Sequence, residues 1–108
     1  MSFNPHSVAV LAEICPHLPR GITTTSWEEA EAKLIPADRR ETLREITDYE
    51  RVGASFISHQ WSDLDRPRVV ELKAAGAHIL CWTVKSAEVE RAARNVADNI
   101  TFEGYLPA

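Results

Sequence analysis

Residues 79–85 read ILCWTVK, and this stretch sets the fold class. A continuous apolar run of this length is typical of a strand in a parallel sheet, where both faces are covered. Ser86 follows as a helix N-cap, and Glu88 and Glu90 lie in the next turn, where the helix dipole favours acidic side chains. The stretch therefore predicts a buried strand that leads directly into a helix.

Three further strands are predicted on either side of this stretch. They are short segments rich in β-branched or aromatic residues, at 20–25, 53–59 and 98–102. The order of the predicted strands along the chain leaves room for a helix between each pair.

Helix-start signals and apolar residues at helical spacing fill these gaps. Asn4 and Pro5 begin one helix, and a second helix is predicted from Pro67 to Ala75, with Gly76 after it. Between 26 and 50 a capping-box pattern starts a longer helical region, which Pro36 is expected to divide into two short helices or to kink.

A strand–helix unit of about 25 to 35 residues thus repeats, which predicts a parallel sheet with right-handed crossovers. Two α/β architectures fit this order: a small open sheet, or part of a (β/α)₈ barrel, whose full length is about 250 residues. Only Met1, Ser2 and Phe3 precede the first predicted helix. We expect the chain to begin at the end of a strand, in the middle of a βα unit, and this favours the partial barrel.

The composition limits the kinds of partner. The chain has 108 residues, enough for one domain, and carries 16 acidic against 12 basic residues at a pI near 5.5. This balance argues against nucleic acid or an anionic membrane as the main partner. Cys15 and Cys81 stand far apart without a Cys/His cluster, so they predict neither a zinc site nor a redox motif. Two buried thiols are expected, and one disulfide is the alternative.

No segment approaches the roughly 20 consecutive apolar residues that cross a bilayer, and residues 1–5 lack the basic and apolar regions of a signal peptide. We therefore expect no membrane span and a cytoplasmic location.

Ligands of parallel α/β folds bind beyond the carboxyl ends of the strands. The residues that close the predicted strands are therefore the candidates for a binding site. They are polar and aromatic, and they lie at 2–4, 23–25, 58–60, 82–85 and 101–103.

Four motifs at and near these positions resemble the C-terminal half of the glycerophosphodiester phosphodiesterases. The family pattern of S-F-(D/N), A-x-G, W-T-V-N and D-G-I-x-T-D-x-P corresponds in order to residues 2–4, 74–76, 82–85 and 98–103. The resemblance implies that residues 1–108 form a single partial domain, about four βα units from the C-terminal half of a TIM-type (β/α)₈ barrel. It also implies hydrolysis of glycerophosphodiesters to an alcohol and glycerol 3-phosphate, in lipid and glycerol metabolism.

The departures from the family pattern bear on catalysis. Lys85 stands where the family has Asn, and Glu103 stands where it has the last Asp. The resemblance implies a catalytic histidine pair and carboxylates that hold a divalent metal, Mg²⁺ or Ca²⁺, in H-R-G, E-x-D, H-D and E-x-K motifs on the early strands. The first three of these motifs do not occur in the sequence.

Hydrolysis of a phosphodiester needs a cation to neutralise charge, and an acid and a base for the two oxygens. We therefore predict no catalytic residue and no metal ligand within this chain, and we expect the isolated chain to be inactive.

Four residues are candidates for contact with a substrate. Trp82 and Phe3 could form an aromatic wall for glycerol, His59 could contact an anion or donate a proton, and Lys85 could neutralise a phosphate. The structural alternatives are a Trp82 packed against a helix, a His59 held by backbone groups and a Lys85 in solvent.

Two non-enzymatic alternatives stay open. An isolated half-barrel would expose its sheet edges and could self-associate into a homo-oligomer. A small α/β module could instead bind sugar phosphates without a metal.

Overall fold

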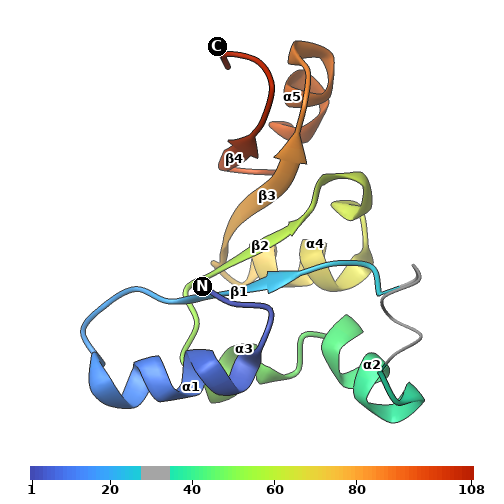
Figure 1. Ribbon diagram of the computed structural model, residues 1–108. Coiled ribbons are helices and arrows are strands. Elements are labelled where there is room, and N and C mark those ends of the chain that lie inside the picture. Colours follow the sequence, from blue (N-terminus) through green and yellow to red (C-terminus); the bar gives the residue numbers. More distant parts are fainter. Residues whose placement is uncertain (28–34) are drawn as a thin grey trace.

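A computed structural model describes residues 1–27 and 35–108 and shows an α/β fold in which strands and helices alternate (Figure 1). The capping-box pattern predicted to start the helical region between 26 and 50 runs into residues 28–34, which lie outside this description. The elements in chain order are α1 (Pro5–Ile14), β1 (Gly21–Thr24), α2 (Ala37–Arg44), α3 (Asp48–Arg51), β2 (Phe56–Gln60), the 3₁₀ turn η2 (Trp61–Asp63), α4 (Pro67–Ala74), β3 (His78–Val84), α5 (Ala87–Ala93) and β4 (Asn99–Phe102).

The four strands form one parallel sheet in the order β1-β2-β3-β4. A fifth position beside β1 is held by a single residue: Ser2 makes a parallel bridge with Ile22, and the Ser2 carbonyl accepts a hydrogen bond from the Thr23 amide at 2.9 Å. The expected strand end before the first helix is therefore present. The prediction of a parallel α/β sheet is confirmed.

Helix starts follow the sequence signals. The side chain of Asn4 accepts a hydrogen bond from the His6 amide at 3.0 Å, and that of Ser86 accepts one from the Val89 amide at 3.2 Å. After Pro36 the chain forms two short helices, α2 and α3, which decides between the two alternatives given for this region.

One face of the sheet packs against the helices. Residues in register on β1, β2 and β3 alternate between the two faces, and Ile22, Ile57 and Ile79 form the buried row. They pack with buried residues of α1, α4 and α5, namely Val8, Val69, Leu72 and Ala93. Figure 1 shows α1, α2 and α3 along one side of β1, α4 behind β2 and α5 beside β3.

The opposite face of the sheet is only partly covered. Thr23, Phe56, Leu80 and Trp82 lie on it, and all four are half-buried. The Phe56 ring lies against Gly21, its partner on β1, so closely that a Cβ at residue 21 would come within 2.3 Å of the ring. Gly21 is therefore required by close approach on this face, which would line the interior of a closed barrel.

Both cysteines are free thiols. Cys81 is buried as expected, whereas Cys15 is partly exposed, which corrects the prediction of two buried thiols. Cys15 is the C-cap residue of α1, where the chain leaves the helix and its apolar face. No helix in the described part of the chain combines the length and the apolar character needed to cross a bilayer.

Candidate functional site

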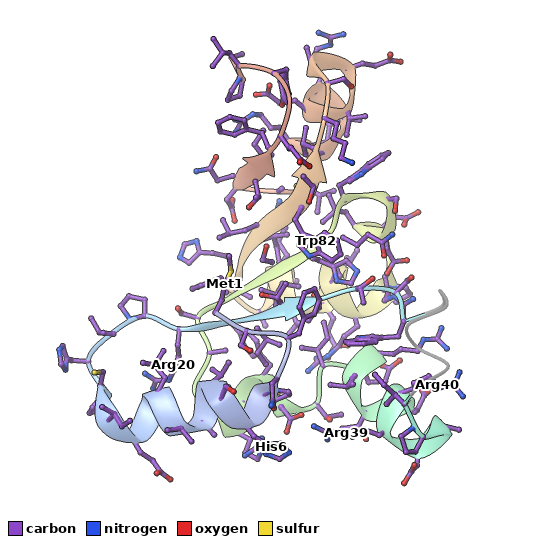
Figure 2. All side chains as sticks on the ribbon, viewed as in Figure 1. Met1, His6, Arg20, Arg39, Arg40 and Trp82 are labelled. Atoms are coloured by element: carbon purple, nitrogen blue, oxygen red, sulfur yellow. The ribbon has the colours of Figure 1, made fainter. Side chains whose placement is uncertain are left out.

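Trp82 anchors the carboxyl edge of the sheet. It lies near the end of β3, and its Nε1–H donates hydrogen bonds to the carbonyl oxygens of Thr24 and Ser58, both at 3.1 Å. The indole thus reaches from β3 across β2 to the end of β1, near the centre of the molecule (Figure 2). Two acceptors on different strands fix its orientation, so its rings form a rigid wall at this edge.

Phe3 and Trp27 complete an aromatic cluster with Trp82. The Phe3 ring meets Trp82 at 5.6 Å between centroids with an interplanar angle of 84°, and it meets Trp27 at 6.1 Å and 79°. Both contacts are edge-to-face, a geometry that the aromatic quadrupole favours. Phe3 keeps 45% of its surface exposed. Two of the predicted site residues, Phe3 and Trp82, are therefore brought into contact.

A hollow of about 330 Å³ opens beside Trp82 at the carboxyl ends of β2, β3 and β4. We name it the Trp82 hollow, and it is lined by Gln60, Trp61, Trp82, Thr83, Lys85, Val89 and Glu103. Lys85, the third predicted site residue, therefore shares a cavity with Trp82. The ends of neighbouring parallel strands bring together residues that are up to 43 positions apart, from Gln60 to Glu103.

His59 lies apart from this group. It pairs in register with Thr24 and Cys81, on the face of the sheet that packs against the helices, and it has no exposed surface. Its Nδ1 is 2.6 Å from Thr24 Oγ1, and its Nε2 is 2.8 Å from Asp63 Oδ2. Both ring nitrogens thus have partners within the fold.

The surroundings of His59 favour a neutral imidazole. Burial lowers the pKa of His59 below its usual value, and the nearby Asp63 carboxylate opposes this shift only in part. Arg66 Nε donates a hydrogen bond to the same Asp63 oxygen at 2.7 Å. Its positive charge opposes protonation of the His59 ring, and so it also lowers the pKa of His59. Contact between His59 and a substrate stays a prediction.

A second hollow of about 350 Å³ lies on the other side of the aromatic cluster, next to Phe3 and Trp27. It is also lined by Arg39 and His6, and both lie on the side of the molecule that carries α1 and α2 (Figure 2). Trp27 and Trp61 were missed as site residues in the sequence. Trp61 directly follows β2, and Trp27 follows β1 after two residues. Both therefore lie just beyond the carboxyl end of a strand, which is the criterion that identified Trp82.

A divalent metal is implied by the family resemblance, and the described side chains do not fit one. Within residues 1–27 and 35–108, no three His, Cys, Asp or Glu side chains gather closely enough to hold an ion. The letters of the fourth family motif, E-x-K, occur at Glu31-Ala32-Lys33, which lies outside the described part of the chain, and at Glu71-Leu72-Lys73, which lies in helix α4 and not on a strand.

No protein-family model matches the sequence, and no curated protein matches it either. Solved structures do. A phosphodiesterase from Oleispira antarctica, in complex with the product sn-glycerol 3-phosphate, matches with a TM-score of 0.67 at 18% identity. A protein from Silicibacter pomeroyi DSS-3, provisionally assigned as a glycerophosphoryl diester phosphodiesterase, matches with a TM-score of 0.69 at 22% identity.

Both matches cover 94% of this chain but only 36% and 33% of the two neighbours, so the chain spans about a third of their length. A likeness at this level of identity defines the fold. The chain has the fold of part of a (β/α)₈ barrel, which it shares with a phosphodiesterase and with a protein provisionally assigned as a glycerophosphoryl diester phosphodiesterase. The predicted fold class and the predicted resemblance are confirmed.

Proposed function

We propose that this chain forms the substrate-binding wall of a glycerophosphodiester phosphodiesterase barrel, as its C-terminal βα units. The observation that carries the proposal is the cluster of Phe3 and Trp82 at the carboxyl edge, beside a hollow that also contains Lys85. This is the edge at which α/β barrels bind their substrates. The Oleispira antarctica neighbour, which shares this fold, is a phosphodiesterase solved with sn-glycerol 3-phosphate.

The chemistry of the edge suits a glycerol phosphate group. Aromatic faces can cover the C–H groups of glycerol, and the rigid Trp82 indole loses little entropy when it does so. The Lys85 ammonium supplies a positive charge for the phosphate, and 71% of its side chain is exposed and free to move toward a ligand. Any contact with His59 would require its ring to leave Thr24 or Asp63.

The proposal assigns binding to this chain and hydrolysis to groups outside the described residues. Water adds to phosphorus, the bond to the alcohol oxygen breaks, and the alcohol takes up a proton, which requires an acid, a base and charge neutralisation. In the family these come from histidines and a divalent metal, for which the described residues offer no cluster. The complete enzyme would act in lipid and glycerol metabolism, and we propose a cytoplasmic location for it.

An activity assay separates binding from catalysis. Purified chain is incubated with glycerophosphocholine and Mg²⁺ or Ca²⁺, and released glycerol 3-phosphate is measured. We expect no release above a blank without protein, while calorimetry detects binding of sn-glycerol 3-phosphate. Metal-dependent release would show that the catalytic groups are in this chain, and absence of binding would refute the assignment of the wall.

A second candidate is self-association through the sheet, favoured by exposed apolar side chains. Phe102 on the edge strand β4 is 47% exposed. The opposite edge of the sheet, beside β1, ends in the single bridge of Ser2. Parallel sheets are normally covered on both faces, and unpaired edges attract further strands. Sedimentation equilibrium at two concentrations tests this candidate: a dimer or larger species supports it, and a monomer at both rules it out. A monomer that binds sugar phosphate without metal would favour the simple binding module.

A further inference from the structure

The loop that follows β1 is held by the end of β2. Gln60 is the last residue of β2, and its Oε1 accepts hydrogen bonds from Thr25 Oγ1 at 2.6 Å and from the Ser26 amide at 3.2 Å. A backbone amide can only donate, so the side-chain oxygen of Gln60 must face it, and the orientation of the Gln60 amide group follows. We name these two hydrogen bonds the Gln60 clamp. They join two segments that are 34 and 35 positions apart in the sequence.

Arg66 holds the same loop through the Ser26 carbonyl. Its Nη2 donates to this carbonyl at 3.4 Å, while its Nε donates to Asp63 Oδ2 at 2.7 Å. Ser26 is 7% exposed, and both polar groups of its backbone therefore have partners on the side of β2 and η2. The backbone directly before Trp27 is thus fixed by two side chains.

Trp27 depends on this backbone for its position. Its φ of 58° lies in the left-handed region, which a bulky side chain rarely adopts and keeps only where the surrounding structure holds it. Its Nε1 is buried and has no hydrogen-bond acceptor within residues 1–27 and 35–108, whereas Trp82 Nε1 has two carbonyl acceptors. Trp27 is therefore placed by its main chain and by packing, and not by a hydrogen bond of its indole.

Phe3 connects Trp27 to Trp82. Its ring makes the edge-to-face contacts with both indoles, at centroid distances of 6.1 Å and 5.6 Å. Phe3 belongs to the short segment before α1, which meets the sheet through the bridge of Ser2 with Ile22. A displaced Trp27 would therefore deprive Phe3 of one ring contact and loosen the aromatic wall beside Trp82.

We propose that the Gln60 clamp positions the aromatic wall, with Thr25 as a positioning residue that acts on the ligand through Trp27 and Phe3. Thr25 does not line the Trp82 hollow, so its effect on a ligand there is indirect. A wall that is already in place when the ligand arrives loses less conformational freedom on binding. This inference rests on the proposed function, because the wall is the one to which glycerol phosphate binding is assigned.

Thr25→Val tests the positioning role, because valine has nearly the shape of threonine and lacks the hydroxyl. We expect calorimetry to show that this variant binds sn-glycerol 3-phosphate about threefold to tenfold more weakly than the unsubstituted chain. In the ligand-free variant, nuclear Overhauser contacts between the Phe3 ring and the Trp27 indole should weaken. Thr25→Ser keeps the hydroxyl and should restore both measurements, whereas a merely structural role would lower the thermal stability alone.

Thr101→Val is the matched control, because Thr101 is exposed on β4 and does not line the hollow, and it should change neither measurement. Thermal unfolding of each variant checks that the fold is retained. An affinity or a ring contact that stayed unchanged in Thr25→Val, or a loss that Thr25→Ser did not restore, would overturn the positioning role and leave the proposed function standing.

The unsubstituted chain supplies a second test that does not depend on the folding of a variant. Nuclear Overhauser contacts between the Phe3 ring and the Trp27 indole should be present without ligand, and their absence would also overturn the positioning role. If the unsubstituted chain did not bind sn-glycerol 3-phosphate, the proposed function would fail together with this inference.

Discussion

At the scale of single residues, the indole nitrogen of Trp82 ties three strands together. Trp82→Phe keeps an aromatic ring but removes the donor to the carbonyls of Thr24 and Ser58. We expect the free energy of unfolding to fall by about 1–3 kcal/mol, because part-buried acceptors lose their partner. Urea unfolding measures this loss. Trp61→Phe is the control, since its more exposed ring should cost less than about 0.5 kcal/mol; equal losses in both variants would refute the role of Trp82.

His59 should make stability depend on pH. Burial holds the pKa of His59 below the ordinary value of 6.5, so below pH 6.5 the unfolded chain takes up a proton that the folded chain does not. The contribution of neutral His59 to stability is therefore complete above pH 6.5 and is lost as the pH falls below it. Urea unfolding at pH 7.5 and pH 5.5 should show the lower stability at pH 5.5.

The substitution His59→Gln should remove most of this difference between the two pH values. His78→Gln should keep it, because His78 is exposed at the start of β3. A difference that survived in His59→Gln would assign the pH dependence to other groups.

The alternation of side chains between the two faces of a strand explains which residues of the candidate site could be predicted from the sequence. Trp82 lies near the carboxyl end of β3, and alternate residues of a barrel strand point to the barrel interior, so its side chain lies at this edge of the sheet. Its contact with a substrate stays a prediction. His59 also ends a strand, but it lies between Ser58 and Gln60, which share the face of Trp82. The alternation of a strand therefore places it on the helix side, and its partners Thr24 and Asp63 come from register and from η2, which no sequence pattern specified.

At the scale of elements, α5 holds the C-terminal segment through Glu90. This carboxylate is buried and accepts hydrogen bonds from Arg94 Nε at 2.8 Å, from the Tyr105 hydroxyl at 3.0 Å and from the Ala108 amide at 3.3 Å. The hydrogen bond from Arg94, together with those from Ala108 and Tyr105, keeps the pKa of Glu90 below its usual value. Its contribution to stability is therefore present above about pH 4.5 and is lost as the pH falls through the lowered pKa.

Tyr105→Phe removes one of these bonds. We expect a lower midpoint of thermal unfolding and faster hydrogen exchange at the Ala108 amide, because the segment loses an anchor on α5. Tyr49→Phe serves as the control, since Tyr49 lies in α3 and away from the C-terminal segment. Exchange at Ala108 that stayed unchanged in Tyr105→Phe would show that this anchor does not order the segment.

The elements themselves could be predicted well because their signals are local. Asn4-Pro5 and Ser86 start helices where they were expected to, and the strand around Trp82 is found at His78–Val84. The turn η2 has no comparable local signal, since Trp61-Ser62-Asp63 contains no helical periodicity and forms only a single 3₁₀ turn.

At the scale of the whole molecule, four parallel strands in sequential order give one face packed by helices and one face left half-covered. The repeated βα order could be read from the sequence, and it leads to a parallel sheet with few alternatives. The register could not be predicted, because pairs such as Gln60 with Trp82 depend on contacts that are distant in sequence. The Trp82 hollow depends on this register and on the shift between Cys81 and Val84 where β3 meets β4.

The central claim is that the carboxyl edge of this sheet binds a glycerol phosphate group. Titration of ¹⁵N-labelled chain with sn-glycerol 3-phosphate, followed by two-dimensional amide NMR, tests it most directly. We expect the largest shifts at the Trp82 indole N–H and at the amides of Phe3, Gln60 and Lys85, with little change at Arg20 and His78, which lie at the opposite ends of the strands. Shifts that were absent, or that centred on Arg20 and His78, would contradict the account.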